Sequence, residues 1–438
     1  MTVIIKFFFL FTLLLAAVVI PSFSVQADNS LAPLITYPDG EAIPNQYIVV
    51  FKEGVADKKV NKHHDDINAL LYEEKKRFKR GLLNELISGI EYTYDFDTFQ
   101  GYAGYFPENV LTKIRESDDV AFVEEDHQVF PNVVQKNAPW GLARISHRER
   151  LVRDTYNKYL YDETAGKNVT VYVLDTGVKI DHAEFQGRAR FGANFVRGEP
   201  DTDINGHGTH VAGIVAGTTF GVAKKAHIVA VKVLGRRGGS NMAVIKGIEW
   251  AVRDHRKAVA EAKRTGKIFK GSVINMSLGG RKSLALNKAA NDAVDAQAVV
   301  VVAAGNGNAD ACKFSPSGAE KVITVAASTI EDTRAWFSNW GICVDLFAPG
   351  KDILSAWIGS NTATRVVSGT SMASPHVAGL AAYFLALSRT PLKPYQVLMK
   401  LIFEATNNAL CEVSSSPNLL AYNGFVHSEI RDDLLSWK

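Results

Sequence analysis

The sequence predicts an α/β protein built on a doubly wound parallel sheet with helices on both faces, preceded by a small α+β domain. Beyond residue 138, short and nearly continuous apolar runs alternate with helical stretches, which is the pattern of a parallel sheet covered on both faces. Before residue 131, the elements follow the order βαββαβ, which is typical of a small ferredoxin-like domain. The length of 438 residues suits two domains with processing segments.

The composition indicates a globular chain without a strong electrostatic bias. Hydrophobic residues make up 47% of the chain and charged residues 22%, which is ordinary for globular proteins. The formal net charge of +3 is too small to indicate a nucleic acid or a membrane surface as partner. We therefore expect neither of these partners, and we expect a monomer.

Residues 1–27 predict a signal peptide. Lys6 precedes an apolar run from Phe7 to Ile20, which is shorter than the roughly 20 residues that span a bilayer. Pro21 follows, and Val25-Gln26-Ala27 offers a small-residue cleavage site. An uncleaved membrane anchor is the alternative interpretation.

Residues 28–45, rich in Pro, Asn, Asp and Gly, are expected to be a linker, and residues 46–130 the small domain. The charge run from Glu73 to Arg80 is interpreted as a solvated helix face. A dibasic processing site is the alternative, but cleavage there would split the domain. The expected elements are strands at Gln46–Phe51, Ile90–Phe96, Gly101–Phe106 and Val120–Val129, and helices within Ala56–Leu86 and at Val110–Arg115.

Residues 131–137 have no strong pattern and suit a cleavable connector, after which residues 138–438 form the large domain. Its expected strands are Val169–Leu174, Ile228–Val233, Val273–Met276, Val299–Ala304 and Val322–Val325. Its main expected helices are Asn241–Lys263 and Ser283–Gln297.

Three segments of the large domain carry candidate catalytic residues. Asp175 follows the strand that ends at Leu174, so it lies at the carboxyl edge of the sheet, where α/β proteins build their sites. His207 lies between two glycines, which leave its ring accessible. Ser371 begins a helical segment. Each residue alone has a simpler explanation, because Asp is a common turn residue and Ser a common N-cap.

Together and in this order, the three residues indicate nucleophilic catalysis. A serine hydroxyl needs a base, imidazole titrates in the useful range, and a carboxylate fixes the tautomer of that imidazole. The order Asp, His, Ser is that of subtilisin, and no G-x-S-x-G elbow surrounds Ser371. Metal ligation by His207 and His210 is disfavoured, because zinc hydrolases with H-E-x-x-H need i,i+4 spacing and a Glu.

Longer segments around these residues carry a family resemblance. Asp175-Thr176-Gly177, His207 to Gly213 and Gly369 to Ala373 resemble the three signature blocks of the subtilase family of serine peptidases. The stretch from Ala138 to Ser146 resembles the proteinase K branch of that family, and cerevisin-like enzymes within it. The resemblance extends from Gln46 to about Gly424. It implies a serine endopeptidase that acts through an acyl-enzyme and needs no cofactor for its chemistry.

The resemblance implies further site residues. Asn306, in Ala303-Ala304-Gly305-Asn306, matches the residue whose amide stabilises the oxyanion together with the Ser371 backbone N–H. Ser277-Leu278-Gly279-Gly280 resembles one wall of the pocket for the residue before the cleaved bond (P1). Gly238-Gly239-Ser240 resembles the edge strand that pairs with the substrate backbone. Broad specificity for proteins and peptides, with an apolar or aromatic P1 residue, is therefore expected. Plain surface loops are the alternative for both segments.

The resemblance also gives the small domain a role. It resembles the propeptide of subtilases, which assists folding and blocks the substrate groove until it is removed. The chain's own propeptide would then be its intramolecular inhibitor. Self-cleavage within residues 131–138 would leave a mature enzyme that begins near Ala138.

The three cysteines, Cys312, Cys343 and Cys411, suggest one disulfide and one leftover thiol in a chain of the secretory pathway. The count does not assign the pair. The resemblance to cerevisin-like enzymes implies a Cys312–Cys343 disulfide and leaves Cys411 as an expected buried free thiol.

Two smaller expectations concern a structural ion and a glycan. Asp345 aligns with a carboxylate that, in proteinase K-like enzymes, binds calcium together with carbonyls near Glu320 and Val322, so structural calcium is a candidate. Asn168 and Asn275 both begin glycosylation sequons. Asn168, at a strand start, is the candidate for glycosylation, whereas Asn275 lies within an apolar strand beside the pocket and is expected to carry no glycan.

Two other classes of function compete with an active serine endopeptidase. A pseudoprotease that serves as a binding module would be expected to have lost part of the triad or Asn306, and all four residues are present. A metal-dependent hydrolase would be inhibited by chelators and not by a fluorophosphonate. For location, we expect the secretory pathway, with the vacuole slightly favoured over the cell exterior.

Overall fold

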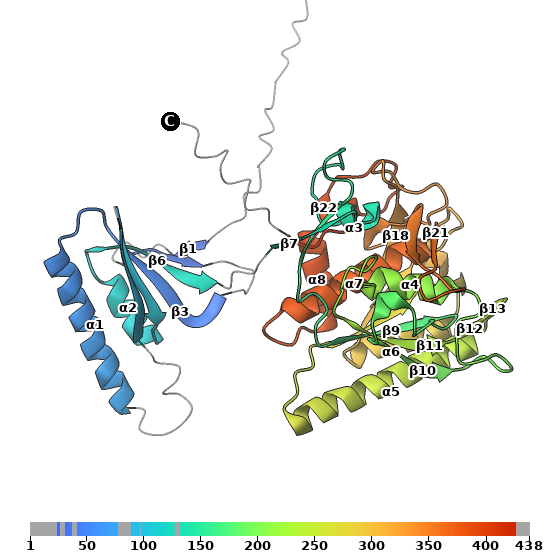
Figure 1. Cartoon of the computed structure of the whole chain (residues 1–438), viewed down its shortest axis with the longest axis horizontal. Helices are drawn as coiled ribbons and strands as arrows, with labels where there is room; N and C mark the ends of the chain where they lie inside the picture. Colours follow the sequence, from blue (N-terminus) through green and yellow to red (C-terminus); the bar gives the residue numbers. More distant parts are fainter. Residues whose placement is uncertain are drawn as a thin grey trace, which may run out of the picture. The chain divides into compact units, whose positions relative to one another are not determined.

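In the computed structural model, contacts divide the chain into two compact units, residues 1–129 and residues 130–438 (Figure 1). Most of the predicted signal peptide and residues 78–88 lie outside the described residues. No helix within the described ranges is long and apolar enough to cross a membrane. The described residues are 24–26, 31–36, 42–77, 89–96, 98–127 and 132–425.

The first unit contains the predicted βαββαβ order, as β3, α1, β4, β5, α2 and β6. Its described sheet has the strand order β1-β2-β6-β3-β5-β4, and β3 pairs antiparallel with both β5 and β6. The predicted linker is partly strand, because β2 and the start of β3 lie within it. The elements are β1 (Ser24–Gln26), β2 (Leu34–Thr36), β3 (Ala42–Phe51), α1 (Asp57–Arg77), β4 (Gly89–Phe96), β5 (Phe99–Tyr105), α2 (Glu108–Arg115) and β6 (Val120–His127).

The first unit has its own apolar core. Alternate residues of β3, Tyr47, Val49 and Phe51, point to the same face of the sheet and are buried. Helix α1 packs Ile67 and Leu71, one turn apart, against this face. The alternation along the strand and the helical spacing along α1 therefore meet in one buried layer.

The second unit is built on a sheet with the described strand order β10-β11-β9-β14-β16-β18-β19-β23-β22. All neighbouring pairs are parallel except β22 with β23. The strands are β9 (Val169–Asp175), β10 (Ala189–Asn194), β11 (His227–Lys232), β14 (Gly271–Met276), β16 (Val299–Ala303), β18 (Ile323–Ser328), β19 (Leu346–Pro349), β22 (Thr406–Asn407) and β23 (Leu419–Leu420). The predicted parallel sheet is confirmed.

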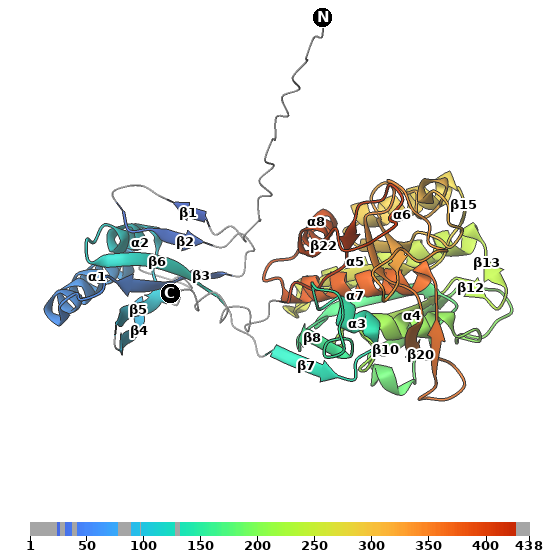
Figure 2. The same ribbon diagram turned by 90° about the horizontal axis from the view of Figure 1, so that it is seen from above.

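Helices cover both faces of this sheet, as Figures 1 and 2 show. Along β9, Val171 and Val173 join the apolar cluster that contains α4, α7 and α8, whereas Tyr172 and Leu174 join the cluster that contains α5 and α6. Burial on both faces explains why the strand reads as a continuous apolar run. The helices are α3 (Trp140–Arg144), α4 (His207–Ala216), α5 (Asn241–Thr265), α6 (Leu284–Asp295), α7 (Thr370–Leu387) and α8 (Pro394–Glu404).

Strand β7 (Asn132–Lys136) lies inside the predicted connector. It pairs antiparallel with β8 (Lys158–Asp162) along its whole length. The Gln135 side chain also donates a hydrogen bond to the Thr219 carbonyl at 2.9 Å. The sequence did not indicate this strand, because its hydrogen-bond partners lie more than twenty residues away along the chain.

A histidine cluster lies in the core of the first unit. The His63 ring accepts or donates a 2.8 Å hydrogen bond with the Tyr102 hydroxyl and packs edge-on against Phe51. Burial, and then the neighbouring His64, lower the pKa of His63 to about 4. The folded unit therefore favours the neutral ring.

We predict that the first unit loses stability as the pH falls from 6.5 to 4. In this range the unfolded chain, with a His pKa near 6.5, binds a proton that folded His63 excludes, so protonation favours unfolding. The check is the urea midpoint for unfolding of residues 42–127, followed by hydrogen exchange at different pH values. The measurement uses the Ser371→Ala chain, in which the expected self-cleavage would not remove this unit. The fall in midpoint should be at least halved in His63→Gln, which keeps a hydrogen-bonding side chain that does not titrate. An equal fall in both chains would contradict the prediction.

Candidate active site

The three candidate catalytic residues lie at element ends on the carboxyl-terminal side of the parallel sheet. Asp175 is the last residue of β9, His207 is the first residue of α4, and Ser371 is the second residue of α7. Parallel strands present their carboxyl ends at one edge, where open α/β sheets bind ligands. The fold therefore brings together segments that are far apart in the sequence.

Asp175 and His207 form a buried hydrogen-bonded pair. The His207 Nδ1 lies 2.7 Å from Oδ1 of Asp175, and the Asp175 carboxylate is fully buried. The same oxygen accepts the Thr176 amide at 2.7 Å. Burial lowers the pKa of His207, but the charge and hydrogen bond of Asp175, and then the charge of Asp203, raise it above its usual value. Asp175 thus favours the tautomer of His207 that holds its proton on Nδ1. Its charge also stabilises the imidazolium form of the ring.

Ser371 is held in the first turn of α7 by reciprocal hydrogen bonds with Ser277. The Ser371 hydroxyl donates to the Ser277 carbonyl at 3.2 Å, and the Ser277 hydroxyl donates to the Ser371 carbonyl at 2.8 Å. Within the described residues, no hydrogen bond joins Ser371 to His207. Hydrogen bonds of this kind are often long or absent without substrate, and a rotation about χ1 would turn the Ser371 hydroxyl away from Ser277.

Behind Ser277, a short polar network supports the start of α7. The buried Asn275 donates to the Ser277 hydroxyl at 3.0 Å and accepts the Ser374 hydroxyl at 2.8 Å. Both ends of the Asn275 amide are therefore engaged inside the protein, which supports the expectation that its sequon carries no glycan. The sequence showed only a polar residue in an apolar strand and did not reveal this network.

Asn306 is oriented by Thr370, a residue that the sequence reasoning missed. The Asn306 Oδ1 accepts both the Thr370 amide at 2.8 Å and the Thr370 hydroxyl at 2.9 Å. The Thr370 hydroxyl in turn accepts the Gly305 amide at 3.0 Å. Because the carbonyl end of the Asn306 side chain is occupied, its NH2 end is left to donate. The only signal in the sequence for this role of Thr370 was its position directly before Ser371.

A pocket of about 270 Å³ lies beside Ser371 and Asn306. Three of the four predicted wall residues, Leu278, Gly279 and Gly280, line it, while Ser277 lies behind Ser371. Phe314, at the start of β17 (Phe314–Ser315), adds an aromatic side chain that the sequence did not indicate. A larger pocket of about 430 Å³, between α6 and residues 318–321, is lined by none of the candidate catalytic or substrate-binding residues.

The segment that is predicted to pair with the substrate consists of a short strand and a helix N-cap. Gly238 and Gly239 form β13, an exposed two-residue strand that pairs with β12 (Leu234–Gly235). Gly238 has a φ of 106°, in the region that favours glycine. Ser240 is the N-cap of α5, and its hydroxyl accepts the Ala243 amide at 3.2 Å. Its side chain therefore has a structural role.

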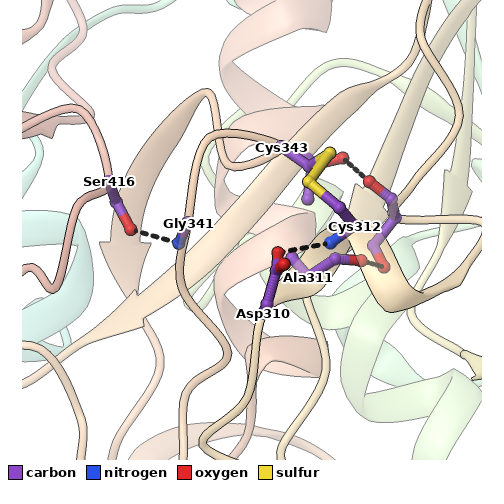
Figure 3. Close-up of a disulfide and its surroundings, with 8 residues drawn as sticks. Asp310, Ala311, Cys312, Gly341, Cys343 and Ser416 are labelled. Carbon is purple, nitrogen blue, oxygen red and sulfur yellow. Dashed lines mark hydrogen bonds between the residues drawn. A yellow bond between two sulfur atoms is a disulfide. The ribbon is translucent and has the colours of Figure 1, made fainter.

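The Cys312–Cys343 disulfide is present, with the two Cα atoms 5.3 Å apart (Figure 3). It joins the segment after β16 to the segment before β19, next to the hydrogen bond from the Gly341 amide to the Ser416 hydroxyl. The expectation of a buried Cys411 is wrong, because this residue is exposed. Its backbone is bonded to Asp332 and Arg334, but its side chain does not enter the core.

The remaining predicted sites are polar positions at strand ends. Asp345 is partly buried, and its Oδ2 accepts the Thr324 amide at 2.7 Å. Burial raises the pKa of Asp345 to about 6. Among the described residues, no group of three or more His, Cys, Asp or Glu side chains is placed to hold a metal ion. Asn168 is half-buried directly before β9, with a φ of 63°.

A serine and an imidazole–carboxylate pair, at the carboxyl edge of a parallel α/β sheet, are the parts of a serine peptidase site. Comparisons with known proteins give the family. The subtilase family model matches residues 166–422, and the peptidase inhibitor I9 model matches residues 46–131. The chain belongs to the subtilase family and is a subtilisin-like serine protease with an I9 propeptide domain.

Its relatives include fungal proteases. It is 47% identical over 426 residues to the subtilisin-like serine protease Pen c 2 of Penicillium citrinum, covering 92% of this chain and 93% of the relative. It is 46% identical over 430 residues to alkaline protease 2 of Aspergillus fumigatus, covering 93% and 87%. A solved structure of a cold-adapted subtilisin-like serine proteinase matches with 41% identity and a TM-score of 0.59, covering 67% of this chain and 100% of that chain.

We predict that Thr370→Val lowers kcat about 10- to 100-fold with little change in KM. The variant loses the hydroxyl that orients the Asn306 amide, a donor whose own loss costs about 10²- to 10³-fold in kcat. Steady-state hydrolysis of a peptide substrate checks this. Thr370→Ser, which keeps the hydroxyl, is the control and should stay close to wild type. Equal kcat in Thr370→Val and wild type would refute this role of Thr370.

Proposed function

We propose that Asp175, His207 and Ser371 are the catalytic triad of a broad-specificity endopeptidase that is made as a self-inhibited zymogen. The observation that carries this proposal is the 2.7 Å contact between His207 and the fully buried Asp175, on the side of the sheet where Ser371 lies in the first turn of α7. A buried carboxylate without such a partner would be costly. The pairing therefore has the geometry of an oriented general base.

The site residues then have distinct roles in the reaction. His207 takes the proton from the Ser371 hydroxyl as that oxygen attacks the peptide carbonyl, and Asp175 stabilises the imidazolium. The Asn306 NH2 group and the free amide at the start of α7 donate to the oxyanion. His207 then protonates the leaving amine, and water releases the acyl group from Ser371 by the reverse sequence of steps.

Substrate selection follows from the pocket and the exposed strand. Leu278 and Phe314 give the 270 Å³ pocket an apolar character, which favours an apolar or aromatic P1 residue. Gly238 and Gly239 offer backbone groups without side-chain demands, so a substrate can add to them as a strand. Both features support broad specificity.

The first unit, residues 46–130, is proposed to act as the inhibitor and to be removed by self-cleavage within residues 131–138. The I9 match to residues 46–131 supports this division. Pairing of β7 with β8 means that a cut at the start of this segment leaves β7 attached to the peptidase unit. A cut near Ala138 would break the covalent link and leave β7 held to that unit only by its pairing with β8.

We further assign the chain to the proteinase K branch, close to cerevisin, and to the secretory pathway with the vacuole favoured. The Ala138–Ser146 segment, the fungal relatives and the disulfide support this assignment, because disulfides persist in oxidising compartments. We propose a monomer that carries a glycan on Asn168 and acts on proteins and peptides.

We predict that Ser371→Ala abolishes processing of the chain. If the chain cleaves itself, loss of the nucleophile leaves residues 46–130 covalently attached, and a fluorophosphonate labels only the wild type. Mass spectrometry of the purified product and sequencing of the mature amino terminus give the readout. Asn306→Ala is the matched control and should process slowly but completely. A normally processed Ser371→Ala chain would exclude self-cleavage.

Calcium is proposed to bind at Asp345, a partly buried carboxylate whose pKa is raised by burial. The carbonyls near Glu320 and Val322, just before Thr324, would complete the oxygen ligands. We predict that calcium raises the Tm of the wild-type chain by several degrees and that Asp345→Asn removes this response. Differential scanning calorimetry with calcium, and with magnesium as control, checks this. An unchanged calcium response in Asp345→Asn would contradict the assignment.

A further inference from the structure

Asp203 is a buried carboxylate in the loop before α4, four residues before His207, and is 5% exposed. Five donors surround it. Its Oδ1 accepts the Thr176 hydroxyl and the Asn205 and Gly206 amides, each at 2.9 Å. Its Oδ2 accepts the Thr209 amide at 3.0 Å and the Thr209 hydroxyl at 2.7 Å.

These donors lie on the two segments that carry the acid and the base of the site. Thr176 directly follows Asp175, and its hydroxyl also accepts the Gly208 amide at 2.9 Å. Thr209 belongs to the first turn of α4, which begins with His207. Asp203 therefore connects the end of β9 to the start of α4 through hydrogen bonds on both sides.

The five donors require a carboxylate rather than an amide. Every one of them points an N–H or O–H at Asp203, so both side-chain oxygens must accept. In Asn, the NH2 end would face at least one of these donors and lose its hydrogen bond. The loop that carries these amides also has a restricted shape at Gly206. The φ of Gly206 is 104°, which suits glycine, and a Cβ there would lie 2.4 Å from the Trp357 ring.

Resting on the proposed triad, we propose that Asp203 is a positioning residue that fixes Asp175 and His207 relative to each other and stabilises the protonated ring of His207 by its negative charge. Three charged or titratable groups bear on that ring: Asp175 on β9, Asp203 in the preceding loop and His210 on α4. The two carboxylates favour the imidazolium, and His210 is buried and neutral. Replacement of Asp203 by a neutral residue therefore makes His207 a weaker base and also removes hydrogen bonds that position it.

The test is Asp203→Asn, processed by a trace of wild-type enzyme and normalised to active sites by fluorophosphonate titration. We expect kcat to fall about 10- to 100-fold while KM changes less than about threefold. We also expect the acidic limb of the kcat/KM profile to move to lower pH. The control is Thr209→Val, which removes the hydroxyl's hydrogen bonds to Asp203 and from the Lys179 amide but keeps the Asp203 charge, so its acidic limb should stay in place.

A merely structural role predicts a different result. Asp203→Asn would then lower the Tm and kcat together and leave the acidic limb unchanged, and this outcome would overturn the proposal. If Asp203→Asn does not fold, Thr176→Val serves instead, because it removes the hydrogen bond between Asp203 and the residue after β9. We expect its kcat to fall while the acidic limb of its pH profile stays in place. An unchanged kcat would overturn the proposal. Failure of the triad itself is distinguishable, because the wild-type chain would then resist the fluorophosphonate.

Discussion

The hydrogen bond between His207 and the buried Asp175 is the interaction on which the candidate site depends. A carboxylate at the end of β9 has little access to water, so its charge must be met by donors that the fold supplies. The Thr176 amide and the His207 ring are two such donors. The Thr176 amide is adjacent in the chain, whereas the His207 ring reaches Asp175 only because α4 begins at the carboxyl edge of the sheet. The chemistry of the site and the packing of α4 therefore have a common cause.

The site also depends on polar groups that do not touch substrate. Thr370 engages the carbonyl end of the Asn306 side chain, and Asn275 supports the Ser277 hydroxyl that bonds to Ser371. Asp203 gathers donors from both sides of the Asp175–His207 pair. Such groups reduce the reorganisation needed when charge develops in the reaction. These groups thus hold the candidate site residues, or the segments that carry them, in place by hydrogen bonds.

Helix starts recur at this edge of the sheet. His207 begins α4 and Ser371 lies in the first turn of α7, and the first amides of a helix have no partner within it. Near α4, donors of this kind are taken up by Asp203. At the start of α7 the same kind of amide is available for an oxyanion. The unpaired amides at helix starts therefore bind the Asp203 carboxylate at α4 and serve the proposed catalysis at α7.

The sequence by itself determined the fold class and the candidate chemistry, because strands buried on both faces read as apolar runs and Asp175, His207 and Ser371 lie in distinctive short segments. It did not reveal β7, the Thr370 and Asp203 contacts or the exposure of Cys411. These features depend on partners far away in the chain, such as β8 for β7 and the end of β9 for Asp203. Local pattern carries no record of such partners, so only the tertiary structure decided them.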